Sequence, residues 1–326
     1  MATTSHLRAE SRVRRRLLAA MAAGPWVPAA HAQPVYPSRP ITLLCWSAPG
    51  SPVDVYARMM SRLLAVELGQ PVVVENRVGA NGIIAINALL KQPPNGYTIA
   101  AVTTTLASLF SEPNVGFKLE DLQPIARSQL DPFALVVHNS TPFRSVDEFV
   151  AFARRKPEYL SVGGPFAMGS HRVAWEVFSE AAKFRTTWIP YPGGGPALTA
   201  IAGGQVEAVA TNPGNVKAFV NAGKVRILAV SSDRRLEDFP GVPTYRERGW
   251  DVVRYQWRGL TARAGTPQPI VDRLASAVQR AQQSAEWKAF LRGESQLDGF
   301  QGPEDFRSLI AQDRQEIETL KKRLGL

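Results

Sequence analysis

The chain has 326 residues, of which 45% are hydrophobic and 20% charged, as in globular proteins with a sizeable core. This length exceeds that of a typical single domain and favours two. The formal net charge of +10 falls to +6 once residues 1–32, which hold five Arg and one Glu, are set aside. This mild excess does not indicate nucleic-acid binding, and no segment after residue 32 is apolar for long enough to predict a membrane span.

Residues 1–32 have the pattern of an export signal. Five arginines between Arg8 and Arg16 precede the short apolar stretch Leu17–Ala30, and Ala30-His31-Ala32 is an A-x-A cleavage pattern. We therefore expect export and cleavage after Ala32. The adjacent arginines at 14–16 leave Sec and twin-arginine export both open.

The segment from residue 41 to residue 102 alternates between apolar runs and helical patterns. Asp54 is the candidate N-cap of the first helix. Strands are expected at 41–46, 72–75 and 97–102, and helices at 54–68 and 83–91. Three successive strand–helix pairs predict a parallel, doubly wound sheet.

A strand at 130–138 is expected to carry the chain into a second region of the same type. Ser145 and Glu148 predict a capping box at the start of the next helix. The expected elements there are a helix at 146–155, a helix that follows His171 and runs to about residue 184, and strands at 159–162, 187–190 and 206–210. The apolar run 225–230 is a candidate for the strand that returns to the first domain, and two long helices, 268–292 and 303–323, are expected to close the chain.

Five loops rich in glycine or hydroxyl side chains each follow an expected strand and precede an expected helix. They are residues 48–54, 79–82, 103–108, 163–171 and 191–196. Because such loops lie at the carboxyl ends of parallel strands, we expect them to converge on one cleft. Their backbone N–H groups, hydroxyls and the Asn81 amide suit a carboxylate held by neutral donors, although ordinary turns are the alternative.

The sequence contains no recognisable catalytic constellation. His138 and His171 have no metal-ligand spacing, and no G-x-S-x-G, Walker A or G-x-G-x-x-G motif is present. We expect His171 to be a helix-start histidine with a local hydrogen bond. No catalytic residue, metal or cofactor is expected, and the protein is not expected to be an enzyme.

Several short fragments follow one another in a characteristic order along most of the chain. They are residues 36–40, the Pro-Gly-x-x-x-Asp loop 49–54, and residues 68–77, 79–82, 94–98, 190–194, 203–206 and 240–244. Together they resemble the Bug-type (TctC-like) receptors of tripartite tricarboxylate transporters.

The resemblance implies a two-lobed α/β fold of the type II periplasmic-binding-protein kind, with mostly parallel sheets flanked by helices. Lobe 1 would comprise residues 33–130 and 240–326, and lobe 2 residues 131–239. It implies a monomeric periplasmic receptor that closes on a small carboxylate between the lobes and delivers it to a membrane permease. The alternatives are an accessory of a membrane sensor or a periplasmic hydrolase.

Matching positions imply contacts with the ligand. These are Ala48, Gly50, Ser51, Asp54, Gly79, Ala80, Asn81, Gly82, Thr104, Gly163, Gly164, Ser170 and Tyr191. The chain departs from the family pattern at Ser51, at the 165–168 loop and at Ala200, where the family often has Asp. These departures disfavour an amino diacid and leave aromatic carboxylates and short dicarboxylates open.

Overall fold

The computed structural model describes residues 36–110, 112 and 115–325. The chain divides at residue 36, and the account below concerns the unit Pro37–Leu326. The expected signal segment 1–32 and its cleavage site lie outside the described residues. Among the described helices, none is long and apolar enough to cross a membrane.

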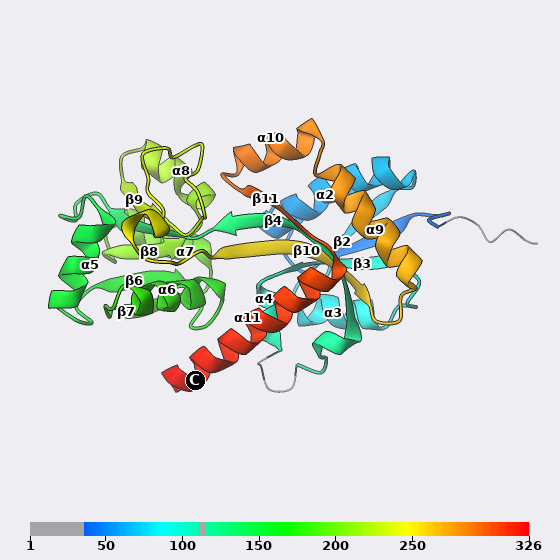
Figure 1. Ribbon diagram of the computed structural model, residues 1–326, viewed down its shortest axis with the longest axis horizontal. Helices are drawn as coiled ribbons and strands as arrows, with labels where there is room; N and C mark the ends of the chain where they lie inside the picture. The colour runs from blue at the N-terminus through cyan, green and yellow to red at the C-terminus, as the bar shows by residue number, and fades with distance from the viewer. Residues whose placement is uncertain (1–35, 111, 113–114, 326) are drawn as a thin grey trace, which may run out of the picture. The chain divides into compact units, whose positions relative to one another are not determined.

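Two mixed sheets flanked by helices form this unit and confirm the expected α/β class (Figure 1). The first sheet has the order β11-β4-β10-β3-β1-β2. Its strands are β1 (Ile41–Cys45), β2 (Val72–Asn76), β3 (Thr98–Thr103), β4 (Leu122–Pro132), β10 (Tyr255–Arg263) and β11 (Leu297–Gln301). β1 pairs parallel with β2 and β3, whereas β10 pairs antiparallel with β3 and β4, and β11 pairs antiparallel with β4.

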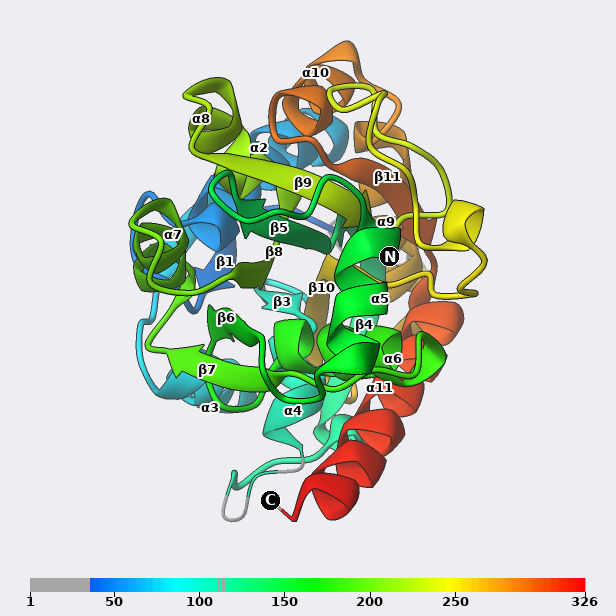
Figure 2. The same cartoon turned by 90° about the vertical axis from the view of Figure 1, so that its left-hand side faces the viewer.

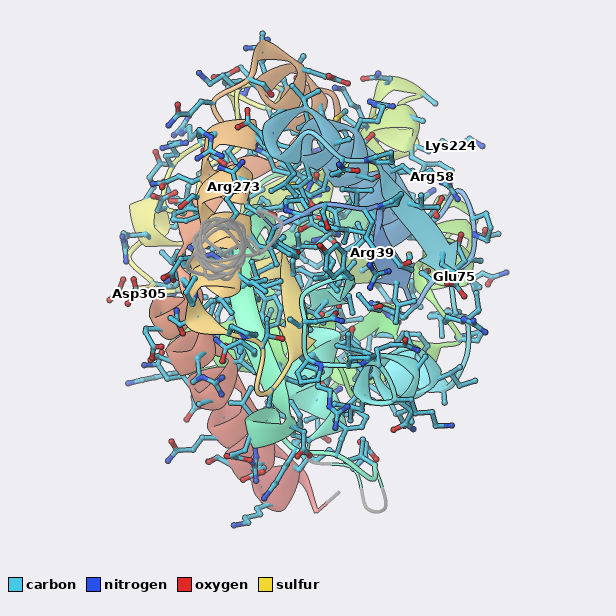
Figure 3. The ribbon with its side chains drawn as sticks, turned by 90° about the vertical axis from the view of Figure 1, so that its right-hand side faces the viewer. Arg39, Arg58, Glu75, Lys224, Arg273 and Asp305 are labelled. Carbon is cyan, nitrogen blue, oxygen red and sulfur yellow. The ribbon has the colours of Figure 1, made fainter. Side chains whose placement is uncertain are left out.

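Apolar helix faces cover both sides of the first sheet. Its helices are α2 (Pro52–Leu68), α3 (Ile83–Leu90), α4 (Thr105–Leu109), α9 (Gln268–Ala281), α10 (Ala285–Gly293) and α11 (Pro303–Leu324), with short 3₁₀ turns η1 (Ala80–Gly82) and η2 (Leu119–Asp121). The buried Trp257 of β10 packs among side chains of α3, α4 and α11. On the other face, α2 contacts α9. Exposed charges of both signs cover this part of the surface, including Arg58, Arg273 and Asp305 (Figure 3).

The second sheet has the order β7-β6-β8-β5-β9. Its strands are β5 (Ala134–His138), β6 (Ser161–Pro165), β7 (Thr187–Tyr191), β8 (Ala208–Thr211) and β9 (Val225–Val230). Its helices are α5 (Val146–Arg155), α6 (Ser170–Ala181), α7 (Gly194–Ala202) and α8 (Pro213–Asn221). Leu135 and Val137 belong to a core cluster with α5 and α6, whereas Ala134 and Val136 belong to one with α7 and α8. Figure 2 shows these two helix pairs on different sides of the second sheet. This alternation places a hydrophobic core on each face.

Two segments carry the chain between the sheets. The first is Phe133, between β4 and β5, and the second is residues 231–254, which include η3 (Arg246–Arg248). The predicted strand 130–138 is therefore wrong as a single element, since β4 ends at Pro132 in the first sheet and β5 begins at Ala134 in the second. A continuous apolar pattern at 133–137 concealed the change of sheet.

The predicted return strand was also assigned wrongly. Residues 225–230 form β9, which pairs with β5 within the second sheet. The chain returns through β10, a strand that sequence periodicity did not reveal because Arg258 and Gly259 interrupt its apolar run.

Two further helix boundaries differ from the prediction. The helix expected at 268–292 is divided into α9 and α10 at Ser284, whose hydroxyl caps α10 by accepting from the Trp287 N–H at 3.1 Å. The first helix begins at the cap Ser51 rather than at Asp54, since the Ser51 hydroxyl accepts the Asp54 N–H at 3.3 Å. The predicted capping box of α5 is confirmed only in its Ser145 half, because the Ser145 hydroxyl accepts the Glu148 N–H at 3.2 Å, whereas the Glu148 carboxylate accepts the Arg144 N–H at 2.6 Å instead of that of Ser145.

Ser231 joins the two crossing segments. Its hydroxyl accepts the Phe133 N–H at 2.8 Å and donates to the Arg254 carbonyl, while its own N–H donates to the Phe133 carbonyl at 2.8 Å. The side chain is buried, at 1% exposure. One small residue therefore satisfies backbone groups of both crossings.

We predict that Ser231→Ala lowers the free energy of unfolding by about 2 kcal/mol, because it leaves a buried N–H and a carbonyl without their hydroxyl partner. Ser232→Ala is the matched control, since the Ser232 hydroxyl is equally buried and has no hydrogen-bond partner among the described residues. We expect the control to be neutral or slightly stabilising. Urea denaturation of both variants tests this, and equal effects would contradict it.

Candidate functional site

A cavity of about 690 Å³ lies where the loops of the two sheets meet. From the first sheet it is lined by the loop before α2, by η1 and by α4. From the second sheet it is lined by residues 165–171, by the start of α7 and by the end of β8. Gln256 and Arg258 of β10 also line it. All five loops singled out in the sequence therefore contribute residues to one cavity.

The first turns of three helices line this cavity. Pro52 and Val53 open α2, Ser170 and His171 open α6, and Gly194 opens α7. The first N–H groups of a helix have no partner within the helix, and its dipole places partial positive charge there. Helix starts from both sheets thus make the cavity favourable for an anion.

The structure distributes the sequence-predicted contact residues unevenly. Ala80, Asn81 and Ser170 line the cavity. The others lie in the same loops or strands but are not among its lining residues: Ala48, Gly50, Ser51, Asp54, Gly79, Gly82, Thr104, Gly163, Gly164 and Tyr191. A ligand contact at any of the thirteen stays a prediction.

Asp54 holds the first loop in shape. Its carboxylate accepts hydrogen bonds from the Gly50 N–H at 2.9 Å, from Asn76 at 2.8 Å and from Arg58 at 2.8 Å. Burial alone would raise the pKa of Asp54, but these three donors lower it below the usual value. The carboxylate therefore fixes the backbone that precedes α2.

Thr104 and Gly164 also have structural partners. The Thr104 hydroxyl accepts the Trp257 N–H at 3.0 Å, which ties α4 to β10. A Cβ atom on Gly164 would lie 2.2 Å from the Trp188 ring, so only glycine lets this ring pack against β6. Thr104 thus fixes α4 against β10, and Gly164 fixes the packing of Trp188 on β6.

His171 bonds to a distant residue rather than locally, so the expected local hydrogen bond is wrong. Its Nε2 lies 2.9 Å from Oδ1 of Asn212, which follows β8, and its ring meets Phe133 edge-on at 5.0 Å. Burial lowers the pKa of His171 to about 4, and the positive charge of Arg258 acts in the same direction. The imidazole is therefore neutral at pH 7.

Arg258 places a buried cation at the cavity. Its guanidinium donates to Gln129 at 2.9 Å and to the Asp131 carboxylate at 3.3 Å, and its side chain is 4% exposed. Burial raises the pKa of Asp131 to about 6, although Arg258 and a hydrogen bond from Gln296 oppose the rise. The loop sequences alone suggested a site with neutral hydrogen-bond donors only. Arg258 adds a charged donor to the lining of the cavity.

Sequence reasoning missed Gln256, Arg258 and Asn212 as cavity residues. Arg258 and Gln256 lie two residues apart on a strand that was not predicted, and Asn212 lay in a loop that was noted but not selected. The available signal was Thr211-Asn212-Pro213-Gly214, a further strand-to-helix loop with a polar side chain. Among the described residues, no group of His, Cys, Asp and Glu is arranged to hold a metal ion.

Comparison with known proteins gives a consistent picture. A family model described as "Tripartite tricarboxylate transporter family receptor" matches residues 56–326. Protein BugT of Bordetella pertussis is 32% identical over 289 residues, which cover 86% of this chain and 87% of BugT.

Two solved structures from Rhodopseudomonas palustris are similar in fold. Rpa4515 with adipate gives a TM-score of 0.76 at 28% identity, covering 89% of this chain and 98% of that one. MatC with bound malate gives 0.70 at 27% identity, covering 87% and 99%. With most of its length matched by the family model, the chain belongs to the TctC family of tripartite tricarboxylate transporter receptors.

Proposed function

We propose that the protein is a periplasmic receptor that captures a small carboxylate in the central cavity and delivers it to a tripartite membrane permease. The observation that carries the proposal is the buried Arg258, which lines the same cavity as helix starts from both sheets. A cation and the positive ends of several helix dipoles together favour an anion more than either feature alone.

The size of the cavity and the ligands of similar proteins support a small acid. A volume of about 690 Å³ lies within the usual range for small-molecule sites. The structures of two similar proteins contain adipate and malate, both of which carry two carboxylates. Family membership supports delivery of the ligand to a permease. In the alternative, the ligand would bind in the same cavity, and the closed protein would contact a membrane sensor instead of a permease.

The way the sheets are joined supports lobe closure. Within the described part of the chain, the two sheets are connected through the single residue Phe133 and through residues 231–254, and a change of backbone angles in these two segments would let the sheets move relative to each other. Closure would exclude water from a ligand held between the sheets. The lobe boundaries given by the family resemblance remain part of this proposal.

The proposal predicts that carboxylates, and not their amides, stabilise the protein. A ligand that binds only the folded state raises the melting temperature by mass action. The test is a thermal-shift screen of protein refolded from denaturant, so that no retained ligand interferes, against aliphatic and aromatic acids and their matched amides. At ligand concentrations near 100 times Kd, the added stability should be about 2.7 kcal/mol. No shift with any acid would refute a carboxylate receptor.

Acid affinity is expected to rise as the pH falls from 8 to 5.5. Below pH 6 the Asp131 carboxyl becomes neutral, and Arg258 then keeps its full charge for the ligand. His171 stays uncharged in this range, and Glu112, a carboxylate at the cavity, is paired with Lys321 at 2.6 Å. If the bound anion raises the Asp131 pKa by about one unit, affinity increases about tenfold.

Calorimetric titration of the best acid from the screen, one whose own carboxyl is ionised above pH 5, measures this dependence. Asp131→Asn is expected to give a flat profile, because residue 131 no longer titrates. A flat wild-type profile, or an unchanged slope in the variant, would contradict the role assigned to Asp131.

A further inference from the structure

Two of the side chains that line the central cavity differ in chemistry, and the name floor is used for this pair alone. Arg258 projects from β10 of the first sheet, and His171 comes from the first turn of α6 beside the second sheet. Both line the cavity, and the charge of Arg258 is close enough to act on the His171 ring. What this pair can bind depends on which ring nitrogen of His171 carries the proton.

Asn212 decides that question. Its amide is 3% exposed and faces two backbone carbonyls of β4, that of Pro132 at 2.9 Å and that of Asp131 at 3.5 Å. Carbonyls only accept hydrogen bonds, so this side of the amide must be the NH₂ group. The opposite side, Oδ1, then accepts, and His171 must donate to it from Nε2.

The other ring nitrogen, Nδ1, is therefore a bare acceptor. No hydrogen bond from a described residue reaches it. Burial and the nearby Arg258 keep the ring neutral, and its position in the first turn of α6 adds the positive end of a helix dipole. A neutral imidazole with this tautomer offers the cavity an acceptor and no charge.

Arg258 retains unused hydrogen-bonding capacity beside it. Its Nε, like Oδ1 of Asp131, is buried and has no hydrogen-bond partner among the described residues. The contact with Asp131 is a single hydrogen bond of 3.3 Å rather than a bidentate pair. Such a guanidinium can still engage a second carboxylate through its planar fork.

We infer that the floor is a subsite for a 2-hydroxycarboxylate, in which Arg258 binds the carboxylate and Nδ1 of His171 accepts the hydrogen bond of the adjacent hydroxyl. This inference rests on the proposed carboxylate-receptor function and narrows its ligand class. An ammonium group could also donate to Nδ1, but it would lie beside the Arg258 charge and be repelled. An unsubstituted acid would leave Nδ1 without a donor.

Three four-carbon diacids test the inference directly, because malate, succinate and aspartate differ only in a hydroxyl, a hydrogen or an ammonium at one carbon. By calorimetry at pH 7.5 on the full chain, malate is expected to bind at least about tenfold more tightly than succinate. Aspartate should bind more weakly than malate by a similar factor or more.

Variants separate the two side chains. His171→Phe should bring the malate-to-succinate ratio of affinities to about one by weakening malate, while His138→Phe, an equivalent change at a histidine outside the cavity lining, should leave the ratio intact. Arg258→Gln combined with Asp131→Asn, which removes both buried charges together, should weaken malate and succinate alike and preserve their ratio.

Nitrogen-15 NMR spectra of the histidine side chains test the tautomer in the wild-type protein. This measurement does not depend on whether the variants fold. His171 is expected to show a protonated Nε2 and a bare Nδ1 between pH 5 and pH 8. Malate should move the Nδ1 resonance, and succinate should not.

The outcomes are distinct. If acids bind but malate and succinate bind equally, or if Nδ1 carries the proton, the 2-hydroxycarboxylate subsite is refuted and the carboxylate receptor stands. If none of these acids nor any acid of the thermal-shift panel binds, the proposed function fails, and the subsite with it.

Discussion

The antiparallel pairing of β4 with β10 is the constraint on which the rest of the molecule depends. It runs from Leu122 opposite Arg263 to Pro132 opposite Tyr255 at the far end. The two strands lie side by side in Figure 1, with Pro132 opposite Tyr255, so both crossing segments meet the first sheet at the same place. Gly259 allows the close approach that this pairing needs, because a Cβ there would lie 2.5 Å from the Ala126 carbonyl oxygen. The position and direction of both crossing segments follow from this ladder.

The same pairing explains why a charge is buried at the cavity. Arg258 of β10 lies next to β4, which supplies Gln129 and Asp131 as its partners. A buried ion pair is costly to desolvate and is often no more stabilising than apolar side chains of similar size. Here one oxygen of the carboxylate and one nitrogen of the guanidinium lack partners among the described residues. We therefore do not expect this ion pair to add much to the free energy of unfolding. Its position at the floor of an anion-favouring cavity gives a functional reason for it.

The parts of the fold that sequence could predict are those fixed by local interactions. The apolar run of β1, the cap and amphipathic face of α5, and the alternation of strands with helices up to β3 depend on neighbouring residues, and their patterns are clear. The loops that line the cavity could be selected because they follow such strands. What was missed depends on distant partners. β10 carries an arginine that is tolerated because the neighbouring strand β4 supplies Gln129 and Asp131 as its partners, and β9 stays in the second sheet because it pairs with β5.

The candidate site likewise contains residues that the local sequence pattern revealed and residues whose role depends on distant contacts. Glycine and hydroxyl residues in the loops were visible in the sequence, but Arg258 and Asn212 gain their importance from contacts with residues 127 and 80 positions away. His171 illustrates the point, since a histidine in the first turn of a helix looks ordinary until its partner is known. No periodicity encodes such a contact.

The hydrogen bonds around Asn212 all point the same way. Nε2–H of His171 donates to Oδ1, and the amide NH₂ donates onward to the carbonyl of Pro132, immediately before the crossing at Phe133. Hydrogen bonds in series polarise one another when each group both accepts and donates. A donor placed on Nδ1 would therefore strengthen every bond down to the backbone of the crossing, whereas an occupant without a donor would not. In the proposed receptor, the chemical identity of the occupant would thus change the hydrogen bonds that hold the crossing segment beside Pro132.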